Sequence, residues 1–421
     1  MSKLFEYLGK IRRDNAGNAL MIGAVTLPML VGAAGLGLDT VQWTLRQREM
    51  QRAADSAAIA GAYAYLQNAN VQTQANLSLT RDGMTGLTTT PIIENAPTAG
   101  IRAGDANAVR VVLATEHPMA FSALFLNRAP TIRVAATATS LSNGDFCVLA
   151  LENTATVGIT MQGNATTDLG CGIATNSIAS NAVVAGGSSV INASPVAAVG
   201  GLSPSSNYAP GTELLPNSII QRDPFADLPQ PVLPTNCSNE LRVNSNQTRT
   251  VSGSSSGVCF RGMRLQGTVH FQPGVYYIDG GSFDVGAQAR VTGSNVTFIL
   301  TSSTAGTNPG SIPQITINGG ATMQLSATTS GTYAGVLFYQ DRRAPNTDGN
   351  RINGNSNSSY QGAFYLPGQG MQFNGTAGMR TECIQMAARR VTFIGNSTIT
   401  NVCPPNSGAG AFSGLRVFLV E

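Results

Sequence analysis

The longest apolar stretch of the chain lies near its beginning, from Ala19 to Leu38. Its twenty residues contain no charged side chain. A helix of that length, with a rise of 1.5 Å per residue, spans about 30 Å, the thickness of a bilayer's hydrocarbon core. Basic residues precede the stretch, and Asp39 and Trp43 follow it, as is typical of a helix with a cytoplasmic N-terminal flank. We predict a single-pass transmembrane helix over 19–38 and a cytoplasmic stub over 1–18.

A cleaved secretory signal is the alternative for this stretch. The small residues Ala33–Gly35 would suit a cleavage site, but Leu36 and Leu38 continue the apolar run beyond them, and a signal's apolar core usually spans only about 7–15 residues. An uncleaved anchor is therefore favoured. With either interpretation, nearly all of the chain is exported.

Small side chains continue the helical periodicity beyond the apolar run. Ala53, Ala57 and Gly61 recur every four residues, and the residues following each of the first two are also alanine. This pattern predicts an alanine-rich stalk helix over 39–70. This wide stripe of small side chains packs either on a partner helix or on the domain that follows, and the second arrangement is favoured.

The next segment, 71–143, contains two stretches that alternate like strands. Residues 110–113 and 131–138 show this alternation and flank a short apolar segment at 121–126, which predicts a strand, a short helix and a strand. Residues 71–107 are rich in Thr, Gly, Asn and Pro and predict loops with at most one strand. We expect a small α/β unit.

Residue 144 begins a repetitive region in which apolar positions recur beside glycine and asparagine. The positions are Ile159, Val291, Ile317, Ile352, Phe373 and Ile394, and the last three are twenty-one positions apart. Short strands with this period favour a right-handed parallel β-helix, a solenoid, over 144–421. A β-sandwich of short hairpins is the alternative, because its turn spacing of about 8–12 residues also fits parts of the region. Eight prolines in 194–234 predict an arm laid over the solenoid or crossing between its rungs.

All six cysteines follow the apolar stretch, which suggests disulfides in an oxidising compartment. They are Cys147, Cys171, Cys237, Cys259, Cys383 and Cys403. Successive pairs are 24, 22 and 20 positions apart, close to one turn of the predicted solenoid. Residues one turn apart lie about 4.8 Å from each other on adjacent strands, within reach of a disulfide. Sequential pairing is therefore predicted, with unpaired buried thiols as the alternative.

The chain contains few residues suited to catalysis. Charged residues make up 11% of the sequence and the net charge is +3, without the basic stripe that nucleic-acid binding needs. Asp279, Asp284 and Asp341, beside Arg342 and Arg343, are the candidates for a carboxylate pair of a polysaccharide-cleaving β-helix enzyme, but they lie in no recognisable motif. We expect no enzyme activity, no cofactor and no nucleic-acid partner.

A few other residues have two interpretations. His270 and His117 are better explained as structural residues than as bases. Residues 346–350 carry oxygen ligands for calcium but lack the full loop pattern, so a polar turn is favoured. The aromatic residues Tyr276, Tyr277, Phe338 and Tyr339 are expected first in the core and second as ligand platforms.

The run from Arg12 to Ala62 resembles the N-terminal segment of TadG-like proteins of the tight-adherence (Flp) pilus system. The resemblance is carried by residues 17–19, Pro28, residues 35–39 and residues 51–58. It extends to 108–140, which implies that the α/β unit over 71–143 is pilin-like. It is less firm in two later strings, 273–281 and 332–344. Two family features are missing. The chain has no Asp-x-Ser-x-Ser motif of a von Willebrand-type domain, and Ile22 stands five residues after Gly17, where a processed pilin carries glutamate.

The resemblance implies a structural protein of Flp pilus assembly, of pilus anchoring or of surface attachment and cell adhesion, which acts by binding. It also implies a bacterial inner-membrane location with the bulk of the chain periplasmic or on the cell surface. The implied partners are the lipid bilayer and other pilus-assembly membrane proteins, with pilin subunits or a surface polysaccharide as further candidates. A polysaccharide-acting enzyme and a minor pilin incorporated into the pilus remain the alternative functions.

Overall fold

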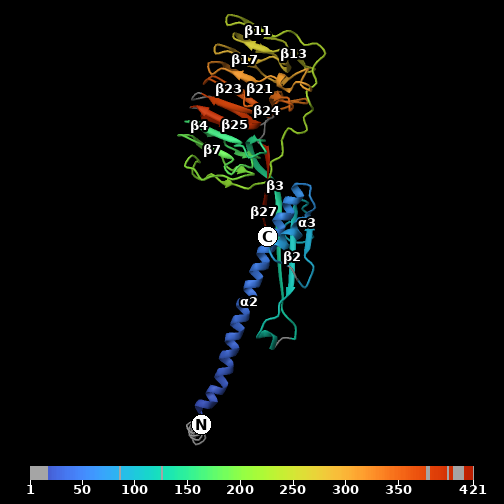
Figure 1. Ribbon diagram of the computed structural model, residues 1–421, viewed down its shortest axis with the longest axis vertical. Helices are drawn as coiled ribbons and strands as arrows, with labels where there is room; N and C mark the ends of the chain where they lie inside the picture. The colour runs from blue at the N-terminus through green and yellow to red at the C-terminus, as the bar shows by residue number, and fades with distance from the viewer. Residues whose placement is uncertain are drawn as a thin grey trace. The chain divides into compact units, whose positions relative to one another are not determined.

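The computed structural model describes residues 18–84, 87–124, 127–375, 380–395, 398–401 and 412–420. The chain divides into two compact units, Met1–Leu141 with Val417–Glu421, and Ser142–Arg416. The first unit contains both described α-helices, and the described regular elements of the second are strands apart from one short helical turn (Figure 1).

The first unit is built on one long helix and a small antiparallel sheet. Its elements are α2 (Asn18–Leu66), α3 (Val71–Arg81), β1 (Ile92–Asn95), β2 (Ala108–Glu116), η1 (Ser122–Leu124) and the first part of β3 (Thr131–Ala150). Strand β2 pairs antiparallel with both β1 and β3. The two strands and the short helical turn predicted between 110 and 138 are therefore present.

The alanine face of α2 packs on its own following elements. Ala53, Ala57 and Ala62 are buried in one cluster with Leu79 of α3 and Val109 of β2. Gly61 lies so close to Val109 that an added Cβ would stand 2.8 Å from its methyl group. Small side chains thus allow the sheet to approach the helix closely.

The prediction of loops over 71–81 is wrong, because this segment forms α3. The Asn70 side chain caps the helix by accepting a hydrogen bond of 2.9 Å from the Thr73 backbone N–H, which satisfies a free amide of the first turn. Ala75 and Leu79 lie one turn apart and bury against α2. Two apolar positions suffice because tertiary packing supplies most helix stability.

The second unit contains three sets of parallel strands, which we call the first, second and third ladders. In each, a strand pairs with the strand three places further along the chain, until the long strands β24 (Ser359–Gly375) and β25 (Arg380–Gly395) contribute to all three. The exception is β10 (Leu214–Leu215), which pairs with the preceding strand β9 (Val196–Ala198). The described pairings between these strands are parallel, so a sandwich of antiparallel hairpins does not fit them. Figure 1 shows the strands stacked in order from yellow through orange and red to green.

The remaining strands follow in the order in which they pair. The first ladder contains β11 (Leu241–Val243), β14 (Met263–Leu265), β17 (Phe283–Val285), β20 (Ile315–Ile317), β23 (Asn350–Gly354), β24, β25, β4 (Ile159–Gly163) and β7 (Val183–Ala185). The second contains β12 (Thr248–Val251), β15 (Thr268–Phe271), β18 (Arg290–Gly293), β21 (Thr322–Ser326), β24, β25, β26 (Thr398–Asn401), β5 (Thr166–Asp168) and β8 (Val190–Asn192). The third contains β13 (Val258–Phe260), β16 (Gly274–Asp279), β19 (Val296–Thr301), β22 (Val336–Gln340), β24, β25, β3, β6 (Gly172–Thr175), β9 (Val196–Ala198) and β10 (Leu214–Leu215). Two further elements are η2 (Pro309–Ser311) and β27 (Phe412–Leu419).

The order of strands in space differs from their order in the sequence. The chain begins the ladders in the middle, at β3 and β4, and extends them in one direction to β10. It then resumes at the far end with β11 and returns strand by strand until β25 pairs with β3 and β4. The ladders therefore contain two segments of chain that meet at β25.

An aromatic column runs through the core of the third ladder. Tyr276, Phe298, Phe338 and Phe364 are successive register partners, and their rings stack at centroid separations of 5.6, 5.2 and 5.2 Å. Each is fully buried. Stacking at this separation adds to the stabilisation from buried apolar area.

The twenty-one-residue period is correct for one interval and wrong by one for the next. Ile352 pairs with Phe373 as predicted, but Phe373 pairs with Phe393 rather than Ile394. A shift in register between Leu366 and Gly370 accompanies the long strands here. The earlier positions are not equivalent either, because Val291 lies in the second ladder and Ile317 in the first.

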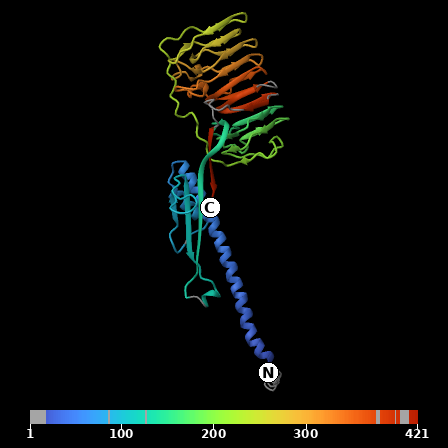
Figure 2. The same ribbon diagram turned by 180° about the vertical axis from the view of Figure 1, so that it is seen from behind.

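Only part of the predicted arm over 194–234 lies outside the ladders, because residues 194–215 contain β9 and β10 of the third ladder. The part after β10 runs along the outside of the third ladder, as Figures 1 and 2 show. It connects β10 with β11. Its side chains Phe225, Leu228 and Leu233 pack on a second apolar column that points away from the core. The column contains Cys259, Tyr277, Ile299, Tyr339, Tyr365, Ala387, Leu149, Ala174 and Ala197. We call residues 216–237 the arm.

Candidate functional site

The exposed apolar surface of α2 distinguishes this helix from every other element that the structure describes. Met21, Leu30 and Leu36 are 73%, 68% and 52% exposed. The helix is long and apolar enough to cross a membrane. In water such a surface would be costly, at about 25 cal/mol for each Å² of apolar area, so it marks an interaction site.

Two residues within the exposed stretch are buried, Gly35 and Asp39. The Asp39 carboxylate accepts hydrogen bonds from the Phe121 backbone N–H at 3.1 Å and from the Ser122 hydroxyl at 2.6 Å. The Phe121 ring lies directly against Gly35, where an added Cβ would overlap it. The loop between β2 and β3 is thus attached to α2 at these two positions.

The carboxylates that the sequence offers for catalysis make separate structural contacts. Asp279 accepts a hydrogen bond of 2.6 Å from the Ser303 backbone N–H. Asp284 forms a partly exposed ion pair of 3.8 Å with Arg264. No group of three or more metal-ligating side chains occurs in the part of the chain that the structure describes.

Asp341 is fully buried and is paired with Arg343 at 2.6 Å. It also accepts a hydrogen bond of 2.7 Å from the Thr301 hydroxyl. Burial acts to raise the pKa of Asp341, but the hydrogen bonds from Arg343 and Thr301 outweigh it and lower that pKa. The carboxylate is therefore held charged, and its oxygen atoms are occupied by side chains of its own domain.

Arg342 fastens the arm to the third ladder. Its guanidinium group donates to the backbone carbonyl oxygens of Phe225, Ala226 and Leu228 and to the Tyr365 hydroxyl. It also lies over the Tyr365 ring, 5.3 Å from the centroid, an arrangement that favours a cation. The residue expected beside a catalytic carboxylate is thus a structural clamp.

The aromatic residues are core residues, as the first of their two interpretations predicted. Tyr276 and Phe338 belong to the stacked column, and Tyr277 and Tyr339 lie beneath the arm. The Tyr339 hydroxyl donates to the Pro229 carbonyl oxygen at 3.2 Å. All four residues are buried.

The histidines and the calcium candidate also have structural contacts. His270 is exposed on β15 with its Nδ1 atom 2.7 Å from the Thr292 hydroxyl, and the His117 backbone N–H donates to the Pro130 carbonyl oxygen. In the 346–350 segment, the side chains of Asn346 and Asp348 accept hydrogen bonds from Arg390.

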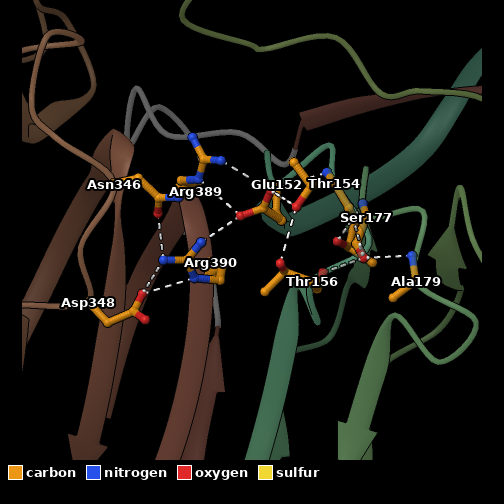
Figure 3. A network of polar contacts seen from close by, with 10 residues as sticks. Glu152, Thr154, Thr156, Ser177, Ala179, Asn346, Asp348, Arg389 and Arg390 are labelled. Carbon is orange, nitrogen blue, oxygen red and sulfur yellow. Dashed lines mark hydrogen bonds and ion pairs between the residues drawn. The ribbon is translucent and has the colours of Figure 1, made fainter.

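The best-defined polar cluster contains no residue that was predicted as a site from the sequence except those of the 346–350 segment (Figure 3). Glu152, whose side chain is 0% exposed, lies between Arg389 at 3.0 Å and Arg390 at 2.6 Å. The Thr154 hydroxyl donates a further hydrogen bond of 2.7 Å. Burial would raise the pKa of Glu152, but these three donors outweigh it and lower the pKa to about 2.

This cluster joins the two segments of the ladders. Glu152 follows β3, and Arg389 and Arg390 belong to β25. Arg390 extends the cluster to Asp348 at 2.9 Å. The one sequence signal was the adjacent pair Arg389-Arg390 in a region poor in charge, and it does not indicate which carboxylate is the partner.

Two disulfides follow the predicted sequential pairing. Cys147 is bonded to Cys171 and Cys237 to Cys259, with Cα–Cα separations of 5.9 and 4.5 Å. Cys147 lies in β3 and Cys171 directly precedes β6, the strand that pairs with β3. Cys259 lies in β13, and Cys237 precedes Ser238, which forms a bridge with Phe260 of that strand. Cys383 is also disulfide-bonded, and Cys403 lies outside the described residues.

These features define a class of protein: one apolar helix able to cross a membrane, followed by a mostly β region with parallel strands. Residues 17–64 match the family model Tad, Flp pilus-assembly TadE/G-like. The matched segment lies almost wholly within α2 and confirms the resemblance found there. None of the curated proteins and none of the solved structures matches the chain.

Proposed function

We propose that this chain is a structural protein of Flp pilus assembly or anchoring and of surface attachment, held in the bacterial inner membrane by residues 19–38. Residues 1–18 are then cytoplasmic, and the remainder is periplasmic or on the cell surface. The observation that carries the proposal is the Tad match at 17–64, which coincides with a helix whose apolar side chains are exposed.

The three ladders are, in this proposal, the three sides of a right-handed parallel β-helix. The support is the constant offset of three strands between partners in the segment from β11 to β23. A second support is that the two disulfides join residues 24 and 22 positions apart, close to the length of one turn. Such a solenoid offers extended surfaces for binding.

Binding takes place on the first and second ladders rather than the third. The arm covers the outer face of the third ladder, whereas the outward residues of the first are polar and, apart from the half-buried Asp284, exposed. Its outward column includes Arg242, Arg264, Asp284, Thr316 and Arg351. Flat polar surfaces of this kind suit other pilus-assembly proteins, pilin subunits or a surface polysaccharide as partners.

Binding without catalysis agrees with the contacts of the charged residues. Asp341 is enclosed by Arg343 and Thr301, and Arg342 is occupied by the arm. A polysaccharide-cleaving enzyme would need carboxylates free to reach a substrate. The minor-pilin alternative predicts a shortened N-terminus, which mass spectrometry of the membrane-bound chain would detect.

The test is deletion of the gene followed by complementation. The deletion strain should lose pili and surface attachment, and the wild-type chain should restore both. Leu30→Arg with Val31→Arg should fail to restore them, because each arginine at the centre of a membrane helix costs about 3 kcal/mol. The matched control, Leu30→Ile with Val31→Leu, should restore both. Normal pili and attachment in the deletion strain would contradict the proposal.

A further inference from the structure

The loop between β2 and β3 is attached to α2 at the level where the apolar run ends. Asp39 is the first charged residue after that run. Gly35, which contacts Phe121, lies one helical turn earlier, about 6 Å towards the centre of the apolar helix. The loop residues 118–124 therefore lie beside the last turn of the predicted membrane span.

The composition of this loop matches such a position. Residues 118–124 contain no charge, and Ser122 is their one polar side chain. The first charged residue after them, Arg128, is exposed, as suits a cation that reaches lipid phosphates. Trp43, 39% exposed on α2, is an aromatic of the type found in the headgroup layer.

The hydrogen bonds of Asp39 give partners to backbone N–H groups of the loop that would otherwise have none near hydrocarbon. Amide groups without partners cost several kcal/mol in lipid. Here the Asp39 carboxylate accepts from the backbone N–H groups of Phe121 and Ser122 and from the Ser122 hydroxyl. The carboxylate is itself buried by the loop. The carboxylate and the loop N–H and O–H groups therefore provide each other with hydrogen-bond partners in a region with little water.

We propose that residues 118–124 lie in the interfacial layer of the lipid bilayer, as a second membrane contact held against α2 by Gly35 and Asp39. The inference rests on the proposed membrane span. In this proposal Gly35 and Asp39 hold the loop against α2, a role that a helix that only crosses the membrane does not need. The loop fixes the orientation of the first unit at the membrane surface.

The test is quenching of a neutral fluorescent dye by lipids with brominated acyl chains. The full chain is reconstituted in phosphatidylethanolamine and phosphatidylglycerol vesicles, with one added cysteine labelled at a time while the native disulfides stay oxidised. Ala123→Cys probes the loop, Val31→Cys the span and Ala103→Cys the other end of β2. All three positions are exposed.

Brominated lipid should quench the dye at Val31 strongly, at Ala123 clearly and at Ala103 not at all. A dye at Ala123 that behaves like the one at Ala103, with Val31 quenched, overturns this inference and leaves the membrane span intact. An unquenched Val31 overturns the span itself and the inference with it.

A second variant tests the attachment. Gly35→Leu places a side chain where the Phe121 ring lies and should reduce quenching at Ala123 to the level of Ala103, with quenching at Val31 unchanged. Gly37→Leu is the matched control, because no atom lies within 4 Å of a Cβ at Gly37. Unchanged quenching at Ala123 in Gly35→Leu would contradict the role given to Gly35.

Discussion

The first unit, called here the helical unit, and the second unit, called the ladder unit, differ in which apolar side chains they bury. In the helical unit, α2 buries small residues such as Ala57 against β2 and leaves large ones such as Leu30 exposed. In the ladder unit, the large aromatics are buried in the core, and those that point outward, such as Tyr339, are covered by the arm. A long run of exposed large apolar side chains on one helix is evidence for a lipid partner.

The largest effect is expected in the aromatic column. Phe338→Ala should lower the free energy of unfolding by about 3–5 kcal/mol, because it removes a fully buried ring from between Phe298 and Phe364 and leaves a cavity. Denaturant titration followed by circular dichroism measures this loss. Phe418→Ala, at a ring 38% exposed, is the control and should cost about 0.5 kcal/mol. Equal losses in both variants would contradict the described core.

Glu152→Gln should cost roughly 3 kcal/mol by leaving Arg389 and Arg390 without their buried partner. Because the pKa of Glu152 in the folded chain is about 2, below its ordinary 4.5, its contribution to stability is complete above pH 4.5. The contribution disappears as the pH falls towards 2, and it amounts to roughly 3 kcal/mol.

Unfolding titrations across this pH range test the carboxylate, with Asp284→Asn as control. The Asp284 pair with Arg264 is about half exposed and should contribute at most about 1 kcal/mol. If Glu152→Gln were as pH-dependent between 4.5 and 2 as the wild type, Glu152 would not be the responsible group.

A smaller effect is expected where the arm is fastened. Arg342→Ala removes the donors to three arm carbonyl groups and should make the arm the preferred site of limited proteolysis, with little change in overall unfolding. Arg351→Ala, at an exposed arginine on β23, is the control. Cleavage sites mapped by mass spectrometry outside 216–237, or equal in both variants, would refute the clamp.

The smallest effect concerns the end of the ladders. Arg249 of β12 shares a register column with Val269, Val291 and Met323, which are fully buried, yet it is itself exposed. A charge at an end position discourages pairing with another chain. Arg249→Val should leave stability unchanged but promote self-association, measured by analytical ultracentrifugation. A monomeric variant at all concentrations would exclude this role.

The apolar run and the cysteine spacing were readable from the sequence because both are local. The run from Ala19 to Leu38 needs only helix length, and the spacing of Cys147 and Cys171 reflects neighbouring strands. Helix α3 was missed because its stability comes from contacts of Ala75 and Leu79 with α2, which no local pattern reports.

The polar sites were beyond sequence reasoning for a different reason. Glu152 and Arg389 are 237 positions apart and meet because the chain resumes the ladders at their far end and returns to β3. The same connection places the arm over Tyr339 and Arg342. Residues that look available for chemistry in the sequence are therefore occupied by segments whose placement depends on the strand order.

The central claim, that α2 crosses a membrane and exports the ladders, has a direct test. Membranes from cells that produce the chain are extracted with carbonate, and intact spheroplasts are labelled at Ala103→Cys with a maleimide that cannot cross membranes. The account predicts that the chain stays in the inner-membrane fraction and that Ala103→Cys is labelled from outside. Recovery in the soluble fraction, or labelling only after lysis, would contradict it.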